Sequence, residues 1–138
     1  MSPLFIDTSA FIALVDKRDK NHSAAARLLK SLSRARRPLI TSTDVMDEVV
    51  TLLRMRIGHS VAVRAGDAIL DSAWCRMLEI DAALRESAWR LFKRYDDQTF
   101  SFTDCTSFAL MAALNTNEAF TFDRRDFGAA GFTALPAP

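Results

Sequence analysis

Cysteine, histidine and long apolar runs are scarce in this sequence of 138 residues. Cys75 and Cys105 lie far apart and form no pair-rich framework, so we expect reduced, buried thiols in a cytoplasmic protein. His22 and His59, without a cysteine cluster, argue against a structural zinc site. No apolar run approaches the ~20 residues that span a bilayer, and no basic leader precedes a long apolar stretch at the N-terminus. We therefore expect neither a membrane segment nor a signal peptide.

The net charge is also small, at +1, which argues against a general nucleic-acid coat protein. Basic residues nevertheless gather at positions 34–37, 54–56, 93–94 and 124–125. Such clusters usually form solvated faces, and phosphate binding requires several of them to converge beside an acidic site. With 49% apolar and 25% charged residues, the composition suits one domain, residues 1–138, with a single core.

Short apolar runs alternate with helical patterns along the chain. Strands are expected at residues 3–6, 38–41, 74–80 and 118–122, with an edge strand at 132–135. Helices are expected at residues 8–15, 21–35, 43–57, 60–71, 82–95 and 102–115, and Ser42 or Thr43, Asp81 and Ser101 fit as caps. This alternation predicts an α/β fold with a mostly parallel sheet covered on both faces, which binds ligands beyond the carboxyl ends of its strands.

Two carboxylates directly follow expected strands. Asp7 ends the apolar run LFI, and Asp123 ends the similar run AFTF. Each acid alone is explained by a helix cap or a turn, because Asp accepts hydrogen bonds from free amides at a helix start. Two strands of one parallel sheet would, however, deliver both carboxylates to the same edge.

Glu48 lies at the border of an apolar helix face formed by Val45, Val49, Leu52 and Leu53. Asp47 points to nearly the opposite side, so we expect Asp47 in solvent and Glu48 partly shielded. Taken alone, a border glutamate is more often an ordinary surface residue.

Asp104 occupies the first turn of a helix, where the helix dipole stabilises an acid. It shares a helix face with the bulky Phe108 and Met111. No Lys or Arg lies within a turn of it, and a buried, unpaired carboxylate is costly. Together with the three acids above it would create strong repulsion unless a cation binds, and oxygen ligands with few His or Cys select Mg²⁺ or Mn²⁺.

At these residues the chain resembles the PIN-domain family, in particular the VapC-like toxin ribonucleases of type II bacterial toxin–antitoxin systems. LFIDTSAFIALVD is similar to the family's opening strand and first acid, and HSAAARLL is similar to its second helix. TSTDVMDEVVTLLRMRIG is similar to the segment with the acidic helix residue, and SFTDCTSFALMAAL followed by AFTFD is similar to the paired C-terminal motifs. GFTALP closes the domain. The resemblance covers essentially the whole chain and implies a three-layer α/β/α PIN-like domain with a mostly parallel central sheet.

Position by position, the resemblance assigns the family's acidic quartet to Asp7, Glu48, Asp104 and Asp123. The small hydroxyl positions near the site, which would hold water or orient a carboxylate, correspond to Thr8, Ser9 and Thr121. One departure concerns the fourth acid. The family's aromatic residue usually follows that acid by three positions, whereas Phe127 follows Asp123 by four. Asp126 is therefore the second choice for the fourth role.

The resemblance implies hydrolysis of RNA phosphodiester bonds with Mg²⁺ or Mn²⁺ as cofactor, leaving a 5′-phosphate and a 3′-hydroxyl. Asp7 and Asp104 would hold the principal ion, with Asp123 as a further ligand and Glu48 acting directly or through water. A second ion roughly 4 Å away would support the leaving oxygen. The resemblance also implies a homodimer and a small antitoxin. The candidates for the antitoxin groove, which are more often core residues, are Leu28, Leu29, Leu32, Leu52, Leu53 and Ile57.

Two other interpretations are open at this point. A phosphorelay receiver also carries acids at strand ends, and Asp81 would be its phosphoacceptor. The chain, however, has no lysine beyond Lys93, and Thr8 stands where a receiver needs a second acid. A catalytically silent PIN-fold module that binds RNA or serves as a scaffold would be expected to lose an acid, whereas all four are present.

Overall fold

A five-stranded sheet forms the centre of the computed structural model, which describes residues 1–71 and 73–138. The strands are β1 (Leu4–Ile6), β2 (Leu39–Ser42), β3 (Arg76–Leu78), β4 (Glu118–Phe120) and β5 (Thr133–Leu135). Their spatial order is β3-β2-β1-β4-β5, and every neighbouring pair is parallel. The predicted parallel sheet and its C-terminal edge strand are confirmed, although β3 and β4 are shorter than expected.

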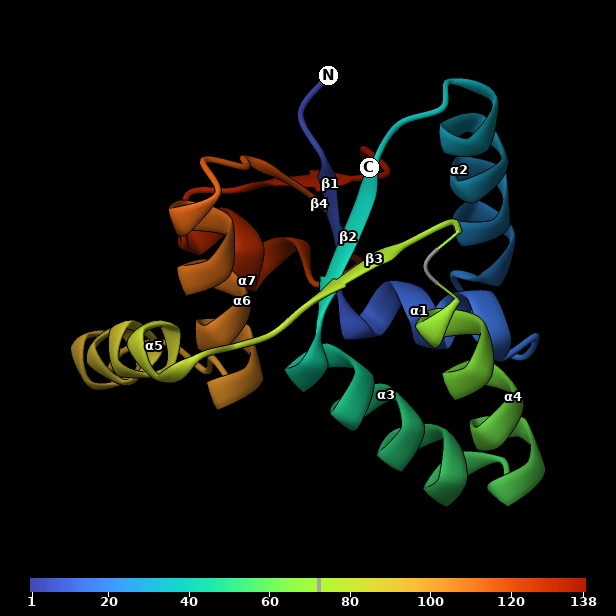
Figure 1. Cartoon of the computed structure of the whole chain (residues 1–138), viewed down its shortest axis with the longest axis horizontal. Helices are drawn as coiled ribbons and strands as arrows, with labels where there is room; N and C mark the ends of the chain where they lie inside the picture. Colours follow the sequence, from blue (N-terminus) through green and yellow to red (C-terminus); the bar gives the residue numbers. More distant parts are fainter. Residues whose placement is uncertain (72) are drawn as a thin grey trace.

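Helices cover both faces of this sheet. They are α1 (Thr8–Val15), α2 (His22–Arg34), α3 (Thr43–Arg56), α4 (His59–Leu70), α5 (Ala82–Arg94), α6 (Phe102–Ala113) and α7 (Arg124–Ala129). In Figure 1, α5, α6 and α7 lie to one side of the sheet and α1 and α2 to the other, while α3 and α4 extend beyond the carboxyl ends of the strands. The expected three-layer α/β/α arrangement is confirmed. Among the described helices, none combines the length and the apolar character needed to cross a bilayer.

The central strand explains why LFI is apolar throughout. β1 lies between β2 and β4, and all three of its residues are buried, as expected for a parallel strand covered on both faces. Leu32 and Leu53, two of the groove candidates, are also buried in this core. Leu28, Leu29 and Leu52 pack against it, so of the six groove candidates only Ile57 is well exposed.

The local cap signals predict most helix starts correctly. Ser42, rather than Thr43, caps α3 by accepting a hydrogen bond from Val45 N, and Asp81 caps α5 by accepting one from Leu84 N. The short helix α7 was not expected. Its sequence, RRDFGA, has too few residues to show a period, and its formation depends on long-range packing, because the Phe127 ring is buried against Phe108 with ring centroids 5.0 Å apart.

Candidate active site

The register of β1 and β4 brings two distant polar residues together. Ile6 pairs with Phe120, so the residues that follow them, Asp7 and Thr121, leave the sheet side by side. Asp7 is only 4% exposed. A strand that is headed for the interior therefore delivers its carboxylate to a buried position at the carboxyl edge of the sheet.

Two hydroxyl groups hold the Asp7 carboxylate. Thr121 Oγ1 donates to Asp7 Oδ2 at 2.8 Å, and Ser9 Oγ donates to the same oxygen at 3.0 Å. Each hydroxyl also accepts a backbone amide, at 3.0 Å from Asp123 for Thr121 and at 2.9 Å from Phe122 for Ser9. Because amides only donate, they direct both hydroxyl protons toward the carboxylate. Asp7 stands at the N-cap of α1 without a side-chain cap hydrogen bond, so capping does not explain it.

Asp104 caps a helix and also lines the acidic cavity. Ser101 and Asp104 form a capping box, in which Asp104 N donates to Ser101 Oγ and Ser101 N donates to Asp104 Oδ2, each at 3.0 Å. No Lys or Arg lies within a turn of Asp104, as the sequence shows, and its local partner at this oxygen is the Ser101 amide. Burial nevertheless raises the pKa of Asp104 from 3.8 to about 6 against the effect of the Ser101 amide, and the negative charges of Asp7 and Asp126 add to the rise.

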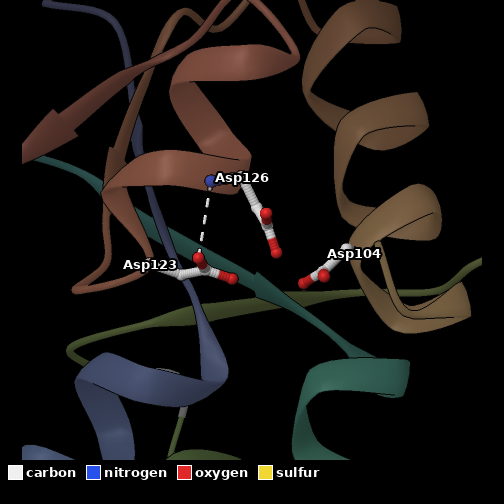
Figure 2. A group of neighbouring side chains, drawn as sticks. All are labelled: Asp104, Asp123 and Asp126. Atoms are coloured by element: carbon white, nitrogen blue, oxygen red, sulfur yellow. Dashed lines mark hydrogen bonds between the residues drawn. The ribbon is translucent and has the colours of Figure 1, made fainter. Parts of the chain in front are cut away.

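Asp123 caps the unexpected helix α7 through Oδ1, which accepts a hydrogen bond from Asp126 N at 3.4 Å. The turn of α7 brings Asp126 back toward the sheet edge. Figure 2 shows the carboxylates of Asp104, Asp123 and Asp126 converging, with one oxygen of each within 4.8 Å of the others. Asp126 thus belongs to the acidic cluster together with Asp123, although it was only the second choice for the fourth acid.

Burial and neighbouring negative charges both raise the pKa values of the acids in this site. Burial raises the pKa of Asp7 from 3.8 to about 6; the Thr121 and Ser9 hydrogen bonds oppose this rise, and the charge of Asp123 adds to it. Burial also raises the pKa of Asp123 to about 6, with further contributions from the charges of Asp126 and Asp104. Each ionised acid therefore makes its neighbours harder to ionise, and a bound cation would relieve this repulsion.

A cavity of about 370 Å³ collects the predicted quartet. Its lining contains all four acids, Asp7, Glu48, Asp104 and Asp123. They come from the end of β1, the interior of α3, the first turn of α6 and the segment after β4. Glu48 is half-buried and its neighbour Asp47 is exposed, as the helical period predicts. Arg56, at the end of α3, is the only basic residue among the described residues that line this cavity.

The donor set fits a hard divalent cation. Carboxylate oxygens are the ligands that Mg²⁺ and Mn²⁺ prefer, and the three carboxylates drawn in Figure 2 converge closely enough to share one ion. The hydroxyl of Thr8 is buried, lines the same cavity and has no hydrogen-bond partner among the described residues. A buried hydroxyl in this state fits a bound water or another polar guest.

Asp81, the phosphoacceptor in the receiver interpretation, does not lie in the acidic site. Asp81 is exposed, caps α5 through a 2.9 Å hydrogen bond from Leu84 N, and is not among the residues that line the acidic cavity. Cys75 and Cys105 are free and buried, as the sequence predicts.

Known proteins resemble this chain over nearly its full length. Residues 4–132 match the model of a family described as the PIN domain. The chain is 42% identical over 133 residues to the 23S rRNA-specific endonuclease VapC20 of Mycobacterium tuberculosis, covering 96% of this chain and 97% of that protein. It is 29% identical over 139 residues to the Ribonuclease VapC26 of the same species, covering 96% of this chain and 100% of that protein.

Solved structures share the same architecture. The crystal structure of Mycobacterium tuberculosis VapC20, described as a Sarcin-Ricin loop cleaving toxin, matches with a TM-score of 0.85 at 40% identity, covering 94% of this chain and 96% of that chain. VapBC2 from Rickettsia felis, bound to a DNA fragment from its promoter, gives a TM-score of 0.73 at 11% identity over 96% of each chain, a likeness of fold alone. The two Mycobacterium tuberculosis relatives are named as nucleases, which is the enzyme class expected from the sequence.

Proposed function

This chain belongs to the PIN-domain family, and from that premise we propose that it is a Mg²⁺- or Mn²⁺-dependent endoribonuclease, the toxin of a bacterial toxin–antitoxin pair. The observation that carries the proposal is the gathering of acids from four separate segments around one cavity. Burial raises the pKa of three of them to about 6. An arrangement that is unfavourable without a ligand is typical of a functional site.

We assign the metal ligands to Asp7, Asp104 and Asp123, with Asp126 beside them and Glu48 acting directly or through water. When bound, the cation lowers the pKa of a water nucleophile and offsets charge on the phosphoryl group in the transition state. Ser9 and Thr121 fix the orientation of the Asp7 carboxylate by their two hydrogen bonds. The unpartnered Thr8 hydroxyl offers a further polar contact inside the cavity.

RNA brings phosphate charge into an acidic cavity, and a cationic side chain beside the acids would offset part of that charge in addition to the metal ion. Arg56 lines the same cavity as the carboxylates and carries the opposite charge. We propose that it binds a phosphate of the substrate. By likeness to VapC20, which is named as specific for 23S rRNA, a loop of ribosomal RNA is the proposed substrate.

The proposed partners follow from the same family membership. A small antitoxin would bind the toxin and suppress cleavage, and two copies of this chain would form a homodimer in the cytoplasm, where free cysteines such as Cys75 and Cys105 persist. Co-purification with a short neighbouring-gene product tests the antitoxin. Light scattering of the purified chain tests the homodimer, and a strictly monomeric mass would contradict it.

Replacement of Asp7 by Asn tests the activity. Asn has the size of Asp, and its amide oxygen can accept the hydrogen bonds that Ser9 and Thr121 donate, but it carries no charge. We expect Asp7→Asn to fold and to lose Mn²⁺-dependent cleavage of a ribosomal RNA loop oligonucleotide. Asp67→Asn, which removes an exposed acid of α4 that lines neither the acidic cavity nor the cavity beside it, is the matched control and should cleave like the wild type.

Undiminished cleavage by Asp7→Asn would contradict the assignment. A wild-type protein that binds RNA, cleaves nothing and takes up no Mn²⁺ in titration calorimetry would favour the catalytically silent module instead.

A further inference from the structure

Three aromatic rings form a cluster on the surface where α5 meets α6. Trp89 and Phe92, one turn apart on α5, are 51% and 41% exposed. Their rings are nearly parallel, with an interplanar angle of 16° and centroids 5.6 Å apart. Phe102, the first residue of α6, meets them edge-on at 6.2 Å and 6.1 Å. Large aromatic surface left in water is unfavourable, and exposed aromatic clusters are typical of a binding surface.

This aromatic cluster, Trp89, Phe92 and Phe102, adjoins the acidic cavity. A second cavity of about 420 Å³ is lined by Phe102 and shares Glu48 and Leu52 with the lining of the first. In addition, Ser101 lines the acidic cavity and directly precedes Phe102. A flexible chain with its reacting phosphate at the acids would reach the aromatic rings by crossing Glu48 and Leu52, the residues that the two cavities share.

Basic side chains flank the rings along α5, whereas the acids Asp44, Asp47 and Glu48 line the cavity on the side of Phe102 that faces α3. Arg85 and Lys93 lie one turn before and one turn after Trp89, so all three share a face of α5. Both basic side chains are exposed, and Arg85 is anchored to Asp44 of α3 by a 2.7 Å ion pair. Within α5, Glu86 is the only acid against four basic residues. Aromatic faces flanked by cations are the combination with which proteins bind unpaired nucleotides.

We propose that the aromatic cluster is a nucleobase-stacking subsite, which holds an unpaired nucleotide of the RNA next to the cleaved bond. The inference rests on the proposed ribonuclease function and adds a requirement for substrate form. RNA with free bases stacks on the rings, whereas a continuous duplex buries its bases within its own stack. Specificity for loops over duplexes then originates on α5 and at the start of α6, outside the acidic cavity.

Binding of a labelled RNA tests the subsite without requiring cleavage. The titration uses the full chain carrying Asp7→Asn, with a short unpaired RNA oligonucleotide and, separately, the same sequence annealed to its complement. Adding Trp89→Ala is expected to weaken binding of the unpaired RNA by about 5-fold to about 150-fold, the effect of losing one stacked ring, with little change for the duplex. Trp89→Phe should restore most of the affinity, because it keeps a ring.

Val63→Ala is the matched control, since Val63 is another exposed apolar residue, 47% exposed, and lies on α4. It should leave both affinities unchanged. The inference is overturned if Trp89→Ala binds unpaired RNA within about twofold of its parent or weakens duplex binding equally. It is also overturned if Trp89→Ala alters only the mass in light scattering, because the rings would then be a contact between copies of this chain.

The two proposals fail in different ways. If the wild type does not cleave RNA with Mn²⁺ but Trp89→Ala weakens binding of unpaired RNA, the nuclease proposal is refuted and the stacking subsite is supported. A protein that cleaves with Mn²⁺ and is indifferent to Trp89→Ala supports the nuclease and refutes the subsite.

Discussion

Replacing Asp7 by Asn is expected to stabilise the metal-free protein at neutral and basic pH, even though it removes a proposed metal ligand. Burial raises the pKa of Asp7 from 3.8 to about 6, so the ionised carboxylate destabilises the fold. At 1.36 kcal/mol per pH unit, this difference corresponds to about 3 kcal/mol in the free energy of unfolding. Asn avoids this cost because it is uncharged, and it retains an acceptor for Ser9 and Thr121.

The sign of the effect follows from proton linkage. Because the folded-state pKa of Asp7 lies above the unfolded value, protonation favours the folded state. This stabilisation is fully present below pH 3.8 and is lost as the pH rises through about 6. The wild type and Asp7→Asn should therefore differ most at about pH 8 and converge toward about pH 4.

Urea unfolding in the presence of a chelator, followed by circular dichroism, measures this difference. Asp47→Asn is the control, because Asp47 is exposed on α3 and its replacement should change stability by less than about 0.5 kcal/mol. Added Mn²⁺ should stabilise the wild type by mass action and stabilise Asp7→Asn less at the same concentration. The reasoning is refuted if Asp7→Asn is less stable than the wild type at basic pH, or if the difference does not change with pH.

Other changes give equally direct tests. Arg56→Ala should reduce the salt slope of RNA binding by about 1, whereas Arg54→Ala, on the same helix end but lining a different cavity, should not; equal effects would show that only general charge matters. Asp126→Asn should lower the pKa of Asp123 in an NMR titration, because its charge raises that pKa, and unchanged Mn²⁺ affinity would place Asp126 outside the metal site. Mn²⁺ affinity in titration calorimetry should fall between about pH 7 and pH 5, since carboxyls with pKa values of about 6 must lose protons to bind. Phe127→Ala should cost about 3–5 kcal/mol in thermal unfolding, and a cost below about 1 kcal/mol would contradict a buried ring.

Local sequence signals predicted the features that depend on a few neighbouring residues. The apolar run LFI marks a central buried strand, and Ser42, Asp81 and Ser101 mark helix starts, because a cap needs only an oxygen and the next turn of amides. The helical period correctly predicted that Glu48 is partly buried and that Asp47 is exposed. These choices are set by backbone geometry within one or two turns.

Local signals could not show which partners hold the acids, because those partners depend on tertiary structure. Asp7 also suited a helix cap, but the sequence could not show that its carboxylate accepts a hydrogen bond from Thr121, the residue that follows β4. The sequence showed no Lys or Arg near Asp104, and a capping box with Ser101 holds one of its oxygens. Asp126 was the second choice because Asp123 ends its strand directly, whereas the turn of α7, with Phe127 packed against Phe108, brings Asp126 beside Asp123.

The sequence by itself determined the alternation of strands and helices, the caps, and the presence of acids at strand ends, since these follow from side-chain type and period along the chain. Tertiary structure decided which acids face one another, which hydroxyls orient Asp7, and which arginine reaches the acidic cavity. The reason is that strand register and helix packing bring together residues up to 114 positions apart, as for Asp7 and Thr121. No local pattern specifies those distances.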